Sequence, residues 1–272
     1  MAKGTIIAVI VVVVVVIAAA GAFFLLKGDD SDPDRVTFLV QDDEGVYFWI
    51  EGSGETVQDA FVDAFSAYPK GTLETSPYGI STLFGVGTTQ DPVSNNYSWW
   101  GQFSWEDDAW TYNATASMPG ILSKDTDYFL VIYGEGTMDG IVVPAGTATP
   151  KDAKVWDGST KGTVFTIASS TGLYFKINGS SSESLIKAFN EASAKYNVPL
   201  VNTESIEYGQ GIDSLFGLGM DQDAEGNWLY WAQYGVNAGA WEATVEGMSS
   251  LKSADYPKFL VQYNGDPADI PV

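Results

Sequence analysis

Hydrophobic and polar positions follow the same pattern twice along the chain. In 36–50, two runs of β-branched and aromatic residues flank the turn Asp43-Glu44-Gly45. In 163–177, two similar runs flank Ser170-Thr171-Gly172. Short runs of this composition around a glycine-containing turn are typical of a β-hairpin. The sequence therefore predicts one hairpin at the start of each copy.

A helical pattern follows each predicted hairpin. Apolar residues recur at spacings of three and four from Val57 to Tyr68 and again from Leu185 to Tyr196. Such spacing places them on one face of an amphipathic helix. Thr56 and a serine at or before position 184 stand where an N-cap is expected. We expect one helix of about three turns in each copy.

The clearest repeat is an eight-residue motif. Ile80-Ser81-Thr82-Leu83-Phe84-Gly85-Val86-Gly87 recurs, 132 residues later, as Ile212-Asp213-Ser214-Leu215-Phe216-Gly217-Leu218-Gly219. Neither motif is a phosphate-binding loop, because no third glycine and no Lys-Ser or Lys-Thr pair follows. The repeated glycines instead predict a tight backbone turn.

Each copy ends with a further predicted strand, at 129–133 and 259–263. The order of hairpin, helix and strands predicts an α+β fold with two tandem β-grasp-like domains, each a mixed sheet with one packed helix. The early helix argues against an immunoglobulin-like sandwich. The predicted boundaries are a membrane anchor at 1–27, an acidic spacer at 28–35, a first repeat at 36–144, a linker at 145–162 and a second repeat at 163–272.

The predicted anchor is the uncharged, mostly apolar segment 5–26, which is long enough to cross a membrane as a helix. The small residues at 18–22 leave a cleaved signal peptide as the alternative. Lys3 precedes the segment and several aspartates follow it, which favours an N-terminus on the inside. The sequence thus predicts a single-pass protein of the cell membrane with both repeats outside the cell.

Composition excludes several functions. The chain has 13 basic and 35 acidic residues, a net charge of −22, and neither cysteine nor histidine. The acidic surface disfavours nucleic acids and anionic lipids as partners. Without His and Cys there is no Ser-His-Asp triad, Cys-His pair or His-ligated zinc. A hydrolase that uses paired carboxylates is the remaining catalytic alternative, but no spacing supports it. We expect no enzymatic activity and assign no catalytic residue.

Both copies resemble the transcobalamin C-terminal-like domain, a β-grasp-type module. The resemblance rests on Thr56-Val57-Gln58-Asp59-Ala60-Phe61 and on Trp231-Ala232-Gln233-Tyr234-Gly235-Val236-Asn237. Ala238 stands where the family usually has glycine, and the first copy diverges after Phe103. The resemblance covers 36–133 and 163–263. In cobalamin carriers the related domain covers one face of the corrinoid, so the resemblance implies a ligand-capping role, with a corrinoid as one candidate ligand.

Aromatic residues cluster in the second half of each copy. Trp100 pairs with Trp231, and Trp110 with Trp241, across the repeat, so these four are expected in the core. Aromatic faces that remain exposed offer large contact areas to a sugar ring, a corrinoid or a protein. The expected ligand-binding residues are Trp99, Trp105, Trp228 and Tyr230.

Two acidic clusters are candidate calcium ligands, Glu106-Asp107-Asp108 and the segment 221–226. The second cluster lacks the acidic residue that a complete calcium loop has at its twelfth position, so we assign no metal site and predict no cofactor. Three asparagines match the N-glycosylation pattern and are candidate acceptors: Asn96, Asn113 and Asn178.

Together these features predict a membrane-anchored, non-catalytic binding module whose ligand is a small molecule, a glycan or a protein outside the cell. The alternative is a structural subunit of a surface filament, because Lys3-Gly4 followed by an apolar helix resembles the start of archaeal pilin-type subunits. That alternative predicts self-association through the anchor.

Overall fold

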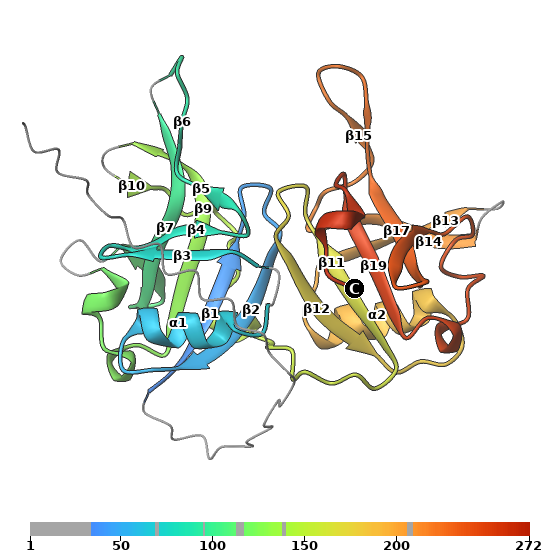
Figure 1. Ribbon diagram of the computed structural model, residues 1–272, viewed down its shortest axis with the longest axis horizontal. Helices are drawn as coiled ribbons and strands as arrows, with labels where there is room; N and C mark the ends of the chain where they lie inside the picture. The colour runs from blue at the N-terminus through green and yellow to red at the C-terminus, as the bar shows by residue number, and fades with distance from the viewer. Residues whose placement is uncertain (1–33, 69–70, 95, 113–116, 138–139, 206–208) are drawn as a thin grey trace, which may run out of the picture.

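The computed structural model describes residues 34–68, 71–94, 96–112, 117–137, 140–205 and 209–272. Figure 1 shows two similar halves side by side, each with one sheet and one α-helix. Both predicted hairpins are confirmed by antiparallel pairing, which joins β1 to β2 and β11 to β12. The two halves correspond to the two copies found in the sequence, and we call them the first and second repeat.

The first repeat is built on a mixed sheet in the order β2-β1-β9-β7-β6, with β1 parallel to β9 and its other pairings antiparallel. β8 and β10 extend it, and β3, β4 and β5 form a separate three-stranded sheet. The elements are β1 (Arg35–Gln41), β2 (Tyr47–Ser53), α1 (Val57–Phe65), β3 (Leu73–Ser76), β4 (Gly79–Leu83), β5 (Val86–Gly87), β6 (Thr89–Gln90), β7 (Tyr97–Glu106), β8 (Ala109–Tyr112), η1 (Met118–Gly120), η2 (Ser123–Asp125), β9 (Tyr128–Thr137) and β10 (Gly140–Ile141).

The second repeat has an equivalent sheet in the order β12-β11-β19-β17-β18. Here β11 is parallel to β19, as β1 is to β9 in the first repeat. Two short antiparallel pairs, β13 with β14 and β15 with β16, accompany it. The elements are β11 (Thr163–Ala168), β12 (Tyr174–Gly179), α2 (Leu185–Lys195), β13 (Leu200–Ser205), β14 (Gly209–Leu215), β15 (Asp221–Gln222), β16 (Trp228–Leu229), β17 (Trp231–Asn237), β18 (Ala240–Ala243), η4 (Ser253–Asp255), β19 (Lys258–Tyr263) and η5 (Pro267–Asp269), with η3 (Pro150–Asp152) before the repeat.

The two helices confirm the predicted stripes and N-caps. Thr56 accepts a hydrogen bond from the Asp59 amide in a capping box, and Ser184 accepts one from the Lys187 amide. Each helix packs directly over a glycine of the neighbouring strand. A Cβ at Gly52 would lie 2.2 Å from the Ala60 carbonyl oxygen, and one at Gly179 would lie 1.9 Å from the Ala188 carbonyl oxygen.

The predicted α+β fold class is wrong for the residues described. Nineteen strands are formed, against two α-helices of only nine and eleven residues. The chain is therefore mostly β. Both helices have about the predicted length, so the error lies in the strands: the stretches outside the helices form many more short strands than the sequence predicted.

The predicted single-pass location at the cell membrane is also corrected. In the part of the chain that the structure describes, no helix is long and apolar enough to cross a membrane. The segment 5–26, on which the anchor, the membrane partner and the outside orientation depended, lies outside the described residues.

The helix-facing sides of the two sheets share one hydrophobic core. Buried residues of both repeats belong to a single cluster of contacts, among them Phe38, Phe48 and Phe129 of the first repeat and Phe165 and Phe175 of the second. The opposite side of each sheet has its own smaller cluster. The repeats are therefore packed against each other. The sequence had predicted two tandem domains joined by a linker, without a shared core.

Candidate functional site

The most exposed of the predicted ligand-binding residues lie on two protruding hairpins. We call residues 88–94 and 96–99 the first arm and residues 220–230 the second arm. The first contains β6 and the start of β7, and the second contains β15 and β16. Figure 1 shows both arms extending from the same side of the molecule, away from α1 and α2.

The second arm exposes two aromatic side chains. Trp228 is 58% exposed and Tyr230 is 49% exposed, and Met220 beside them is 70% exposed. On the first arm, Tyr97 is 41% exposed. Trp99 is only half-buried, with its ring lying over Gly136 of β9. Each arm thus carries an aromatic pair at matching positions.

Trp105 lies elsewhere and has a different environment. It is half-buried, and its ring makes an edge contact with Trp110 at a centroid distance of 4.9 Å. Trp110 Nε1 donates a hydrogen bond to the Ala148 carbonyl at 2.9 Å, and Trp241 Nε1 donates to the Ile270 carbonyl at 3.1 Å. These two equivalent tryptophans hold the segments that follow β10 and β19 against the sheets. Trp105 supports that contact and is not part of either arm.

The expected core tryptophans divide into two groups. Trp100 and Trp231 are 3% and 6% exposed, as the repeat predicted. Each indole donates a hydrogen bond to a main-chain carbonyl at the base of its arm, Val86 for Trp100 and Leu218 for Trp231. Trp110 and Trp241 are half-buried instead.

The acidic clusters support turns. Asp107 and Asp108 have positive φ values of 50° and 61° between β7 and β8, a conformation that Asp tolerates in a two-residue hairpin turn. The Asp223 carboxylate accepts hydrogen bonds from the Glu225 amide and from Asn227, and these bonds lower its pKa. Within the described residues, no group of three or more acidic side chains could hold a metal ion.

The candidate glycosylation sites differ in accessibility. Asn178 is 6% exposed, and its Nδ2 donates to the Lys161 carbonyl at 3.1 Å, so a glycan on this atom would have to displace that bond. Asn96 is partly exposed and its amide contacts Glu135. Asn113 lies outside the described residues.

The contact between the repeats is formed by equivalent aromatic residues. Phe48 stacks on Phe175, its counterpart 127 positions later, with ring centroids 5.4 Å apart and an interplanar angle of 5°. Tyr47 makes an edge contact with Phe216, and Phe84 makes the reciprocal one with Tyr174, at 5.1 and 5.3 Å. Reciprocal contacts of this kind define a pseudo-twofold interface.

The repeated eight-residue motif contributes to this interface. Its predicted tight turn is confirmed, because Phe84 and Phe216 have φ values of 52° and 55° and each precedes a glycine with φ of 82°. A left-handed conformation is uncommon for a bulky residue. In both repeats the turn projects its phenylalanine toward the opposite repeat.

Asp42 is a buried carboxyl at the same interface. It is 2% exposed, and Thr171 Oγ1 of the second repeat donates to its Oδ2 at 3.2 Å. Glu44 of the same turn accepts a hydrogen bond from the hydroxyl of Ser170 at 2.5 Å. Burial raises the Asp42 pKa to about 7, opposed by a hydrogen bond from Ser169 and reinforced by the charge of Glu44. Ser169 is the counterpart of Asp42 in the second repeat. An aspartate at position 169 would place a second carboxyl beside Asp42, and the repeats differ at this position.

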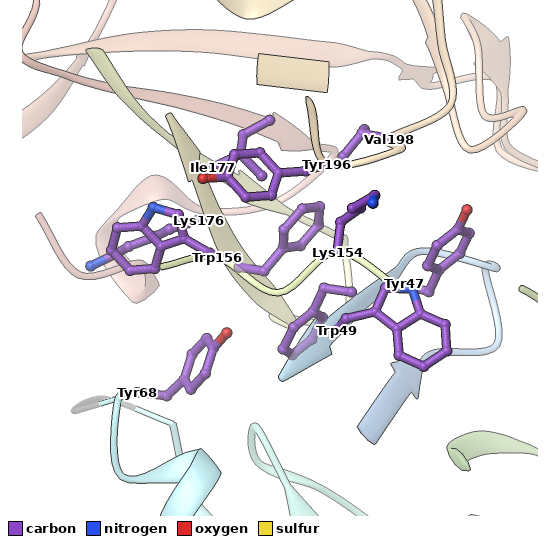
Figure 2. A pocket seen from close by; sticks show the side chains of 11 residues that line it. Tyr47, Trp49, Tyr68, Lys154, Trp156, Lys176, Ile177, Tyr196 and Val198 are labelled. Carbon is purple, nitrogen blue, oxygen red and sulfur yellow. The ribbon is translucent and has the colours of Figure 1, made fainter. Parts of the chain in front are cut away.

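A cavity lies beside this interface, on the side of Tyr196 (Figure 2). Tyr47 and Trp49 of β2 line it together with Lys154 and Trp156 of the linker. Its volume is about 20 Å³, room for a water molecule but far below the roughly 300 Å³ of a typical small-molecule site. The cavity therefore offers no preformed site for a corrinoid or a sugar.

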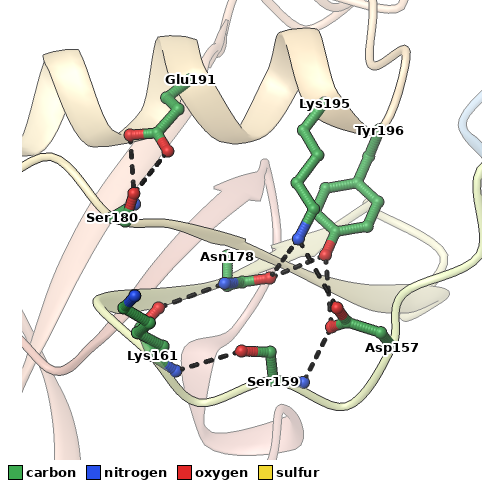
Figure 3. Close-up of polar contacts among 8 residues, drawn as sticks. All are labelled: Asp157, Ser159, Lys161, Asn178, Ser180, Glu191, Lys195 and Tyr196. Atoms are coloured by element: carbon green, nitrogen blue, oxygen red, sulfur yellow. Dashed lines mark hydrogen bonds and ion pairs between the residues drawn. The ribbon is translucent and has the colours of Figure 1, made fainter.

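A polar network fixes the linker beside the cavity (Figure 3). Asn178 Oδ1 accepts hydrogen bonds from the Tyr196 hydroxyl at 2.7 Å and from Lys195 Nζ at 3.3 Å. Lys195 also forms an ion pair with Asp157 at 3.7 Å. The linker, α2 and β12 are joined by these contacts.

Sequence reasoning did not identify the groups between the repeats. Asp42, Glu44 and the hydroxyls at 169–171 are ordinary turn residues in the sequence, and the aromatic residues at 47, 48, 174 and 175 fit a strand facing its own core. The available signal was the repeated Phe84 and Phe216. Both phenylalanines adopt a backbone conformation that is uncommon for a bulky residue, and both contact the opposite repeat.

Comparisons with known proteins give little further guidance. No family model matches the chain, and no curated protein matches it. Among solved structures, a crystal structure of a "putative metal binding protein" from Ruminococcus gnavus is similar over 38% of this chain and 99% of its own length. The sequence identity is 16% and the TM-score is 0.27. At that TM-score the similarity carries no argument about function.

Proposed function

We propose that the chain is a non-catalytic binding protein whose two arms contact the ligand. The observation that carries this proposal is the pair of exposed aromatic residues on the second arm, Trp228 and Tyr230, with Tyr97 and Trp99 at the equivalent positions of the first. Large aromatic side chains gathered on a protrusion indicate a contact surface, because their faces give wide apolar contact at low entropic cost.

The packing between the repeats supports joint use of the arms. The stacked Phe48 and Phe175 and the two reciprocal edge contacts hold the repeats together. Both arms extend from one side of the molecule (Figure 1). A ligand that reaches both arms gains from an intramolecular second contact. The filament alternative rests on the segment 5–26, outside the described residues, and no described contact favours it.

Replacing both Trp228 and Tyr230 by alanine should raise the ligand dissociation constant at least tenfold, because each truncation removes an aromatic contact worth on the order of 1 kcal/mol or more. The measurement is tryptophan fluorescence titration of the full chain against oligosaccharides, corrinoids and peptides, followed by calorimetry of any probe that binds. Tyr78→Ala is the matched control, since Tyr78 is 81% exposed but lies between β3 and β4. Equal losses in the double variant and the control would refute the role of the arm.

A further inference from the structure

The two arms share a face with the same chemistry. Gln90 is directly opposite Tyr97 across the first arm, and Gln222 is directly opposite Trp228 across the second. Residues opposite each other in an antiparallel pair project from the same face. Trp99, two positions further along β7, follows on that face, and Tyr230 lies at the equivalent position just beyond β16. Each arm therefore presents one glutamine and two aromatic residues.

The aspartates of the arms are engaged away from this face. Asp221 is opposite Leu229, so its side chain projects from the other face. Asp91 accepts hydrogen bonds from the Val93 amide at 2.7 Å and from the Ser94 hydroxyl at 2.7 Å, and Asp223 accepts equivalent bonds within its own turn. These carboxylates hold the tips of the arms in shape. Glu225, at the tip of the second arm, is replaced by an uncharged residue in the first.

Positive charge is absent from the sequence around both arms. No Lys or Arg occurs between Lys70 and Lys124, or between Lys195 and Lys252. The chain as a whole has a net charge of −22. A polyanion would be repelled and would find no cation on the arms. The ligand of this face is therefore uncharged or cationic, and the glutamine-aromatic face itself favours an uncharged one.

We propose that the arms bind a neutral polysaccharide. This inference rests on the proposed binding function and names its ligand class. The aromatic rings stack on the apolar faces of the sugar rings, while the amide of Gln222 exchanges hydrogen bonds with hydroxyl groups. The two arms are held at a fixed separation by the interface between the repeats, so they contact separate stretches of a polymer. A monosaccharide fills one arm only, and binds more weakly than a long chain.

The test uses the full chain on an array of neutral, anionic and amine-bearing glycans, with a lysine-rich peptide as an additional probe. A neutral polysaccharide should bind, and calorimetry should show at least a tenfold weaker interaction in both Gln222→Ala and Trp228→Ala. Tyr78→Ala should bind as the native chain does. Thermal unfolding of each variant shows that the fold is retained.

The outcomes distinguish an error in the ligand class from an error in the binding face. If the lysine-rich peptide or a charged glycan binds through Trp228 while neutral glycans do not, the arms bind a ligand but the neutral polysaccharide is refuted. If a neutral glycan binds equally to the native chain and to both variants, or if no probe binds, the assignment of this face is refuted together with the ligand class.

Discussion

Phe175→Ala should lower the free energy of unfolding by about 3–5 kcal/mol and separate the unfolding of the two repeats. Phe175 is 4% exposed, stacks on Phe48 and contacts Phe216 at 6.0 Å. Truncation therefore opens a cavity at the centre of the pseudo-twofold interface. Denaturant unfolding followed by circular dichroism should show one transition in the native chain and two in the variant.

Phe165→Ala is the matched control for this result. Phe165 is fully buried and contacts Phe189 and Phe259 within the second repeat. Its truncation should cost a similar free energy, since a ring of the same size is lost from a packed core, but should leave the interface in place. A single transition in Phe175→Ala, or two transitions in Phe165→Ala, would contradict the account of the interface.

Stability should fall as pH rises from about 4 to about 7, by up to about 4 kcal/mol. The Asp42 pKa is raised from 3.8 to about 7 by burial, so the folded chain binds a proton in this range that the unfolded chain has released. Glu44 and Asp43 on the same turn reinforce the shift, and the groups that face Asp42 from the second repeat are hydroxyls. Chemical denaturation between pH 5 and pH 8 measures the slope.

Asp42→Asn should abolish most of that slope, because the amide keeps the shape of the side chain without ionising. Below about pH 4 the trend should reverse in both proteins. The pKa values of Asp91, Asp152, Glu191 and Asp223 are lowered by hydrogen bonds in the folded chain, so their contribution to stability is lost as they are protonated. An unchanged slope in Asp42→Asn would show that other groups govern the range between pH 5 and pH 8.

Periodicity in the sequence was sufficient to locate the first hairpin, the helix and the repeated turn of each repeat. The hairpins, the helices with their caps at Thr56 and Ser184, and the turn in the repeated motif all depend on local patterns, and all are confirmed. The fold class was wrong because it weighed one regular helix per repeat more heavily than many short strands. β3, β5 and β6 contain no buried residue, so they leave little hydrophobic pattern to detect.

The interface between the repeats could not be predicted from local sequence patterns, and the reason is physical. Phe48 and Phe175 alternate correctly for strands that face their own helices, and nothing in that alternation shows that one core continues into the other. Likewise, Trp105 was predicted to be exposed, but it packs on Trp110, which is directly opposite it in the β7–β8 hairpin. Trp228 and Tyr230 are exposed, as their selection from the sequence required, and their role in binding stays a prediction.

Hydroxyl-radical footprinting of the full chain, with and without a saturating neutral polysaccharide, tests the role of the arms most directly. It reports ring by ring where the ligand lies and requires no substitution. We predict protection of Tyr97 on the first arm and of Trp228 and Tyr230 on the second, with Tyr78 and Tyr112 unchanged, although both are exposed in the free protein. Protection confined to other surfaces, or no change on either arm while the polysaccharide is bound, would contradict the account.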